Sequence, residues 1–336
     1  MMELLFASLF DYGLFLAKTL TLVLGIAVLL ILALRARQGS DHSEHLEITD
    51  LNERYRSLTQ ALKEFSLPKK AYKTFLKAER KREKEREKAA QSDRPRLFVI
   101  EFNGDIRASE VAALRVLVTA LLLEAQPGDE VLVRLDNAGG MVSEHGLAAS
   151  QLARIRAKGI PLTVAVDKVA ASGGYLMACV ADRILAAPFA ILGSIGVLAE
   201  LPNFHRLLER HGVDFELHTA GEYKRTLTVF GENTDEGRQK LREQLEETHD
   251  LFKSFVAEYR PALDLERVAT GEYWHGQRAV ELGLVDAIQT SDDYLLAASE
   301  EKELLKLKYS VHKKPIERLL SSIQASLDRA FATWRG

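Results

Sequence analysis

The chain has 336 residues, 47% of them hydrophobic, and a net charge of −3 that gives no electrostatic case for a nucleic-acid partner. Its single cysteine excludes an intramolecular disulfide framework. The sequence has no HExxH, CxxC or Walker motif, so we predict one catalytic-size domain with appended segments that uses neither a metal nor a cofactor.

The N-terminal part of the chain is predominantly apolar over residues 14–34. A helix of that length rises about 30 Å, which is enough to cross a bilayer. A cleaved signal peptide is the alternative, but such peptides have a shorter apolar core and a basic front, whereas Glu3 and Asp11 precede this run. We therefore predict a retained, single-pass membrane anchor over residues 1–37.

A highly charged segment follows the anchor and extends over residues 38–95. Residues 38–50 are polar and predicted to be loose, and residues 51–90 are helical in character. Lysine, arginine and glutamate alternate over residues 77–90, so the acidic side chains cancel the field that a nucleic-acid partner would need. We predict a solvated helix or flexible spacer here, ending at Pro95.

From residue 96 the pattern changes to apolar runs that alternate with helical spacing. The predicted strands are residues 96–102, 131–135, 161–166 and 183–187, and the predicted helices are residues 109–123, 146–156 and 234–259. Strands that recur with helical crossovers indicate an α/β domain with a largely parallel sheet, placed at residues 96–290. Residues 291–336 are predicted to form a C-terminal helical extension, in which residues 316–334 carry one apolar helical face.

Residues 184–201 are apolar enough to resemble a second membrane span. Pro188, Gly193 and Gly196 interrupt the run, and the buried strands and turns of an α/β core give the same pattern. We predict core strands in this segment.

One serine is surrounded by small residues in the sequence AASGGYLMAC. Ser172 follows a predicted strand and precedes a short predicted helix, so backbone N–H groups without helical partners lie beside it. Gly173 and Gly174 have no Cβ, which lets a substrate approach closely. A nucleophile needs such a setting, because the N–H groups can hold a developing oxyanion. The alternative is an ordinary N-cap serine in a glycine-rich turn.

Two further segments supply partners that a nucleophilic serine needs. The sequence DNAGG also follows a strand, and Gly139 or Gly140 is a candidate backbone donor, with a simple turn as the alternative. His145 is close to Gly140 in sequence and is kept as a candidate base. Lys224 is a second candidate, because a buried lysine loses its charge more readily, but a surface lysine is the alternative.

Five motifs occur in the same order as in a known family: DNAGG, AASGGYLMA, GSIGV, GEYKRTLTVF and GEYWHGQRAVELGLVD. With them the chain resembles the signal peptide peptidase A family of serine peptidases, by motif over residues 96–290 and by layout over its whole length. The resemblance implies a Clp/crotonase-like fold of stacked ββα units and a homo-oligomeric assembly.

The resemblance also implies a Ser/Lys catalytic dyad. Ser172 corresponds to the nucleophile and Lys224 to the general base, and their spacing suits a family form in which both lie in one domain. Ser194, in the GSIGV motif, corresponds to a serine that orients the lysine. A second membrane span at residues 184–201 would separate the two dyad residues, which must meet within about 3 Å for proton transfer.

The turn that holds the oxyanion departs from the family pattern at one position. Gly139 corresponds to its first glycine, and Gly140 and Gly173 complete the predicted donor region. Many relatives have proline before these glycines, where this chain has Ala138, which loosens the turn.

These expectations describe a membrane-anchored serine endopeptidase that hydrolyses apolar peptides, such as signal-peptide remnants or damaged membrane and exported proteins. Its predicted partners are peptide or protein substrates, the lipid bilayer and other copies of the chain. A non-catalytic membrane scaffold with the same fold is one alternative, and a crotonase-like acyl-CoA enzyme is another.

The expected location is the inner membrane of a bacterium, and two indications disagree on the side that holds the domain. Arg35 and Arg37 follow the apolar run and favour the cytoplasm. The resemblance favours a domain outside the cytoplasm, on the periplasmic side.

Overall fold

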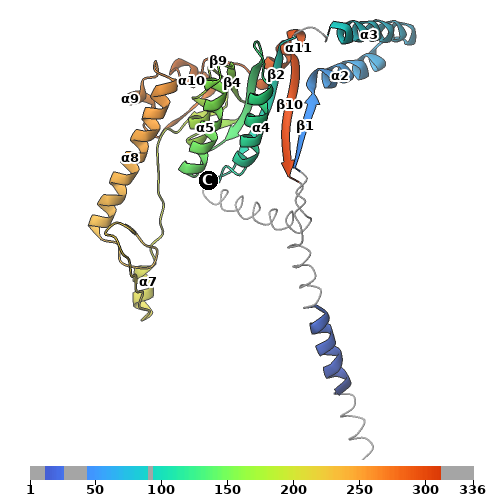
Figure 1. Ribbon diagram of the computed structural model, residues 1–336. Helices are drawn as coiled ribbons and strands as arrows, with labels where there is room; N and C mark the ends of the chain where they lie inside the picture. Colours follow the sequence, from blue (N-terminus) through green and yellow to red (C-terminus); the bar gives the residue numbers. More distant parts are fainter. Residues whose placement is uncertain (1–11, 26–43, 90–93, 312–336) are drawn as a thin grey trace, which may run out of the picture. The chain divides into compact units, whose positions relative to one another are not determined.

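The computed structural model describes residues 12–25, 44–89 and 94–311 (Figure 1). Residues 12–25 are helical, and none of the helices in the described ranges has both the length and the apolar character of a membrane span. The remainder of the predicted anchor and the predicted helix at residues 316–334 lie outside the described residues. Residues 46–309 fold as one unit, which contains the candidate site.

The elements of this unit include all the strands and helices predicted between residues 96 and 259. The strands are β1 (Glu44–Asp50), β2 (Arg96–Gly104), β3 (Glu130–Asn137), β4 (Leu162–Val166), β5 (Val169–Ala171), β6 (Arg183–Ala186), β7 (Ile191–Gly193), β8 (Tyr273–His275), β9 (Ala287–Ile288) and β10 (Glu303–Val311). The helices are α2 (Leu51–Ser66), α3 (Lys69–Ala89), α4 (Val111–Glu124), α5 (Val142–Ala157), α6 (Gly173–Ala178), α7 (His205–Arg210), α8 (Asp235–Tyr259), α9 (Leu265–Val268), α10 (Gly276–Glu281) and α11 (Ser291–Glu301).

The strands form a mixed sheet whose main path has the order β1-β10-β2-β3-β4-β6-β9. The pairs from β10 to β9 along this path are parallel, which confirms the predicted α/β class and the largely parallel sheet. A short branch, β5-β7-β8, leaves β3, and its last pair is antiparallel. The central strands are runs of valine, leucine and alanine because both of their faces are covered.

An apolar core lies on each face of the sheet. On one face, α4 and α5 lie side by side and bury Leu114 and Leu152 against β2 and β3 (Figure 1). On the other face, Leu51 at the start of α2 and Leu295 of α11 pack against Leu132. The unit is therefore layered as helix, sheet and helix, as expected for an α/β domain.

Two neighbouring strands at one side of the sheet, β1 and β10, differ from the prediction. Residues 44–50, predicted to be loose, form β1, and the predicted helical extension contains β10 immediately after α11. In β10, leucine and lysine alternate over residues 305–308, which is the period of a strand with one covered face. Both strands depend on partners that are distant in sequence, and the helical character of the neighbouring segments conceals them.

Residues 184–201 contain β6 and β7, joined by a turn at Pro188. Ile184, Leu185 and Leu192 are completely buried in the sheet. The structure therefore confirms the predicted core strands in this segment.

An ion pair joins the end of α8 to the segment before β9. Arg260 Nη2 lies 2.7 Å from Asp286 Oδ1, and the N–H of Ile184 donates to the other carboxylate oxygen at 2.7 Å. Burial alone would raise the pKa of Asp286, but the hydrogen bonds from Arg260 and Ile184 outweigh it and hold the pKa below its ordinary value. The folded state therefore favours the charged carboxylate.

Candidate active site

Ser172 occupies a strained turn between β5 and α6. Its φ of 50° and ψ of −119° are seldom adopted by an L-residue and cost about 1–3 kcal/mol. Its N–H donates to Gly193 O at 2.8 Å, and its side chain makes no capping bond to α6. The hydroxyl therefore does not serve as an ordinary helix cap. A strained strand-to-helix turn is also the setting that exposes the nucleophilic serine of other hydrolases.

Ser194 follows the neighbouring strand at the equivalent position. Ala171 of β5 pairs with Gly193 of β7, so Ser172 and Ser194 each come directly after a paired residue. Ser194 also has a positive φ, 51°, and its N–H donates to Glu272 O at 2.6 Å. The sheet thus brings together the two serines that the sequence singles out.

The glycine turn after β3 lies against Ser172. A Cβ on Gly139, whose φ is 88°, would stand only 2.8 Å from the Ser172 Cβ, so glycine is required there. The N–H of Gly139 donates to Asn137 Oδ1 at 2.8 Å. Among the described residues, no acceptor meets the N–H groups of Gly140 and Gly173. These two are therefore the donors available to an oxyanion.

An apolar cavity of about 330 Å³ opens beside these groups. Ser172, Gly140 and Gly173 line it at one side. Its apolar lining comes mainly from α6, α8 and the segment after β7, through Leu176, Val197, Leu251, Phe252 and Phe255. The cavity can take an apolar side chain next to the serine hydroxyl.

The structure does not bring Lys224 to Ser172 within the described part of a single chain. Lys224 is exposed in the segment between β7 and α8, where its N–H donates to Gly221 O at 3.2 Å. Its amine makes no hydrogen bond to Ser172 or Ser194 in the described residues, and it does not line the cavity. Large apolar side chains of the same segment are also exposed, among them Phe204 and Phe215.

His145, the other candidate base, has a different place in the site. It is completely buried on α5, and its ring nitrogens lie 2.9 Å from Met141 O and 3.2 Å from Asn137 Oδ1. Neither nitrogen meets Ser172, so the structure argues against His145 as the base. Asn137 has a contact role that the sequence interpretation missed. An asparagine two residues before a glycine is a known signal for a side-chain-capped turn.

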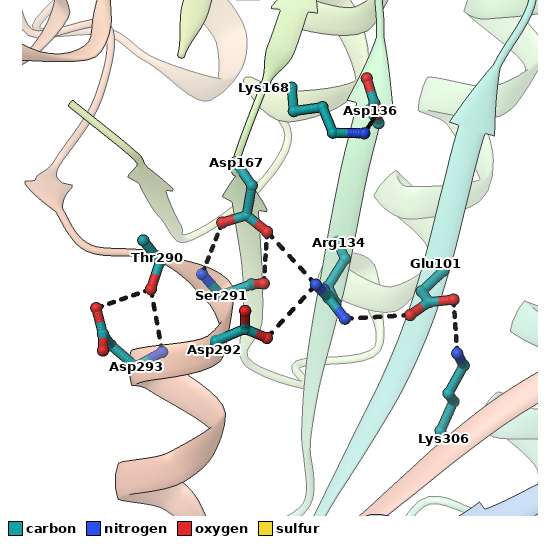
Figure 2. Close-up of polar contacts among 10 residues, drawn as sticks. All are labelled: Glu101, Arg134, Asp136, Asp167, Lys168, Thr290, Ser291, Asp292, Asp293 and Lys306. Carbon is teal, nitrogen blue, oxygen red and sulfur yellow. Dashed lines mark hydrogen bonds and ion pairs between the residues drawn. The ribbon is translucent and has the colours of Figure 1, made fainter. Parts of the chain in front are cut away.

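A second polar cluster, on the sheet, joins α11 to the loop before β5 (Figure 2). Asp167 accepts hydrogen bonds from the N–H and Oγ of Ser291 at 2.8 and 2.5 Å, and Arg134 lies 3.6 Å from it. Lys168 Nζ donates a hydrogen bond to Asp136 Oδ2 at 2.9 Å, and this bond raises the pKa of Lys168. Lys168 is only four residues from the nucleophile candidate, but this pairing keeps it charged and unsuited to act as a base.

Comparisons with known proteins agree with the motifs. The N-terminal model of peptidase family S49 matches residues 7–152, and the peptidase family S49 model matches residues 154–305. A probable protease SohB from Haemophilus influenzae is 49% identical over 320 residues, which are 91% of this chain and 90% of the relative. Another from Buchnera aphidicola subsp. Acyrthosiphon pisum is 46% identical over 95% of both chains.

A more distant relative, the putative signal peptide peptidase SppA of Enterococcus faecium, is 31% identical over 61% of this chain and 60% of its own length. These matches confirm the predicted resemblance to signal peptide peptidase A proteins, with SohB proteins more similar. On the identity and coverage of these relatives, and on two family models that follow one another along the sequence, this chain belongs to peptidase family S49.

Proposed function

We propose that this chain is a membrane-anchored serine endopeptidase with Ser172 as nucleophile and Lys224 as general base. One observation carries the proposal. Ser172 is held in a strained turn at the wall of an apolar cavity, next to two backbone N–H groups, those of Gly140 and Gly173, that have no acceptor among the described residues. This is the arrangement that acyl transfer needs, a hydroxyl beside preorganised oxyanion donors.

In the proposed mechanism, the neutral amine of Lys224 takes the proton from Ser172 Oγ while the oxygen bonds to the scissile carbonyl carbon. Gly140 and Gly173 hold the oxyanion, in place of the Gly139 donor that the sequence favours, because Gly139 already donates to a side chain. The C–N bond then breaks, and the lysine ammonium gives its proton to the leaving amine. Water, deprotonated by the same lysine, hydrolyses the acyl-enzyme ester.

A second copy of the chain brings Lys224 to the nucleophile in this proposal. The lysine is exposed, and its segment presents apolar side chains to solvent, including Phe204 and Phe215, which are 44% and 41% exposed. A neighbouring copy that covers these side chains would bury the amine, and burial favours the uncharged form that a base needs. Homo-oligomer assembly and the dyad are then parts of the same proposal.

Apolar peptides are the proposed substrates because of the apolar lining of the cavity. The apolar run at residues 14–34 is the proposed anchor. The α/β domain is proposed to have the Clp/crotonase-like fold of stacked ββα units. A reporter fused after Gly336 and active in only one compartment decides between the cytoplasmic and periplasmic sides.

The test uses a fluorogenic apolar peptide and a serine-reactive phosphonate probe. We expect Ser172→Ala to lose both hydrolysis and labelling, because no other described group replaces the nucleophile. Ser143→Ala is the matched control, since Ser143 lines the same cavity and is expected to leave both signals unchanged. Equal hydrolysis by wild type and Ser172→Ala contradicts the proposal. An intact protein without labelling supports the non-catalytic scaffold.

A further inference from the structure

His145 connects the two backbone segments of the site. Its ring lies against the start of α6, because a Cβ on Gly173 would stand 2.4 Å from the ring Cγ. Its Nε2 lies 3.2 Å from Asn137 Oδ1, at the end of β3. The His145 side chain thus touches α6, which carries the proposed donor Gly173. It also touches Asn137, which holds the turn that carries the other proposed donor, Gly140.

The Asn137 side chain is fixed in one orientation. Its Oδ1 accepts the N–H of Gly139 at 2.8 Å, and its Nδ2 lies 3.3 Å from Met177 Sδ. A Cβ on Gly104 would stand 2.3 Å from the Asn137 Cγ, so the amide is enclosed on that side. The amide cannot swing away from the turn without displacing backbone, and Oδ1 faces both Gly139 and His145.

These contacts replace a constraint that the turn lacks. Proline would fix the backbone before the two glycines, but this chain has Ala138, whose φ is free. The bond from Gly139 to Asn137 restrains the turn from outside the backbone, and His145 restrains Asn137. His145 is itself held in place by its complete burial and by its contact with the start of α6.

We infer that His145 is a positioning residue that holds the oxyanion donors in register through Asn137 and Gly173. The inference rests on the proposed serine peptidase function and deepens it. His145 does not transfer a proton to or from substrate. It acts on the transition state, because displacing an oxyanion donor by about 1 Å costs on the order of 100-fold in rate.

Two substitutions test the contact between the ring and Asn137. Asn137 Oδ1 accepts, so the ring bonds it in the tautomer that carries its proton on Nε2. The amide nitrogen of glutamine reaches about as far as Nε2, so His145→Gln keeps a donor for Asn137. The amide of asparagine reaches only as far as Nδ1, so His145→Asn loses the contact to Asn137. The pair therefore tests the Asn137 contact specifically.

We expect His145→Asn to lower kcat on an apolar peptide by about 30- to 100-fold, with KM within about threefold of wild type. His145→Gln is expected to stay within about fivefold of wild-type kcat. A peptide aldehyde, whose hemiacetal places an oxygen in the oxyanion site, is expected to bind more weakly in proportion to the loss of kcat. If His145 had a purely structural role, its substitution would lower the amount of folded protein, and the loss of aldehyde affinity would not follow the loss of kcat.

Equal kcat for wild type, His145→Gln and His145→Asn overturns the inference. If melting curves show that the histidine variants do not fold, Asn137→Asp and Asn137→Leu decide in their place, because only aspartate keeps the acceptor for Gly139. Equal activity in those two also overturns it. A wild-type protein without hydrolysis or probe labelling contradicts the proposed function, whereas active wild type with equal variants contradicts only this inference.

Discussion

Filling the cavity beside Ser172 should narrow specificity while making the protein more stable. Gly146 lies on α5 and lines the cavity, and a Cβ there would meet nothing within 4 Å. The substitution Gly146→Leu therefore places an apolar side chain in open space inside the cavity. Glycine in a helix is less favourable than leucine by about 1 kcal/mol, so the variant gains stability from the helix alone.

The effect on catalysis follows from the area that a substrate can bury. The cavity has about 330 Å³, and a leucine side chain takes up part of the space that an apolar substrate side chain would fill. A substrate leucine or phenylalanine that loses this burial forfeits about 1.5–3 kcal/mol, which is about 10- to 150-fold in kcat/KM. A substrate with alanine at that position buries little there and should change by about threefold or less.

The assay compares kcat/KM for two fluorogenic peptides that differ only in alanine or leucine before the scissile bond. The alanine peptide is the internal control, because a general defect would slow both. A melting curve should show Tm higher by about 2–4 °C, as expected for ~1 kcal/mol in a domain of this size. A raised Tm with an unchanged ratio between the peptides would refute the assignment of this cavity to the substrate side chain.

Three further predictions concern the dyad, the glycine turn and the ion pair at the end of α8. Mixing inactive Ser172→Ala with inactive Lys224→Ala should restore hydrolysis above either variant alone, because each supplies the group the other lacks across an interface; no recovery after co-expression contradicts a base from a second copy. Gly139→Ala should lower kcat by at least about 100-fold, since its Cβ would meet Ser172, whereas Gly159→Ala, which has a similar φ of 77° but open space around its Cβ, should cost only about 1 kcal/mol of stability and no activity. Asp286→Asn should lower the free energy of unfolding by ~1–2 kcal/mol at pH 7, and this difference should shrink as urea unfolding is repeated toward pH 3. In the wild type, the pKa of Asp286 is lower in the folded state than its unfolded value of about 3.9, so the carboxylate stabilises the fold above that pH. This stabilisation is lost as the pH falls through the folded pKa. A difference between wild type and variant that stays constant with pH would contradict the reasoning.

The sequence predicts the centre of the sheet better than its edges. The strands β2, β3, β4 and β6 are continuous apolar runs because they are buried on both faces, and this pattern is visible without any partner. β1 and β10 have weaker patterns, and each is stabilised by a strand from the other end of the chain. The short strands β5, β7 and β8 have three residues each, too few to show a period.

In the candidate site, too, some residues can be predicted from the sequence and others cannot. Ser172 and the glycine turn can be located from sequence, because glycines and small residues directly mark close approach of backbone segments. The hydrogen bond from Gly139 to Asn137 and the burial of His145 depend on how side chains pack, which the sequence does not display. In the proposed mechanism, Lys224 reaches Ser172 across an interface between two copies, which the sequence of one chain does not display.

The pairing of β2 with β10 has a consequence for how the protein is made. Residues 96–100 of β2 pair with residues 303–307 of β10, so this strand has no outer neighbour until most of the polypeptide has left the ribosome. Until then, a nascent chain displays an unpaired row of amide groups beside apolar side chains, which is a template for aggregation. Biosynthesis of this protein should therefore depend on protection of that edge during translation, and truncation before residue 303 should give insoluble product.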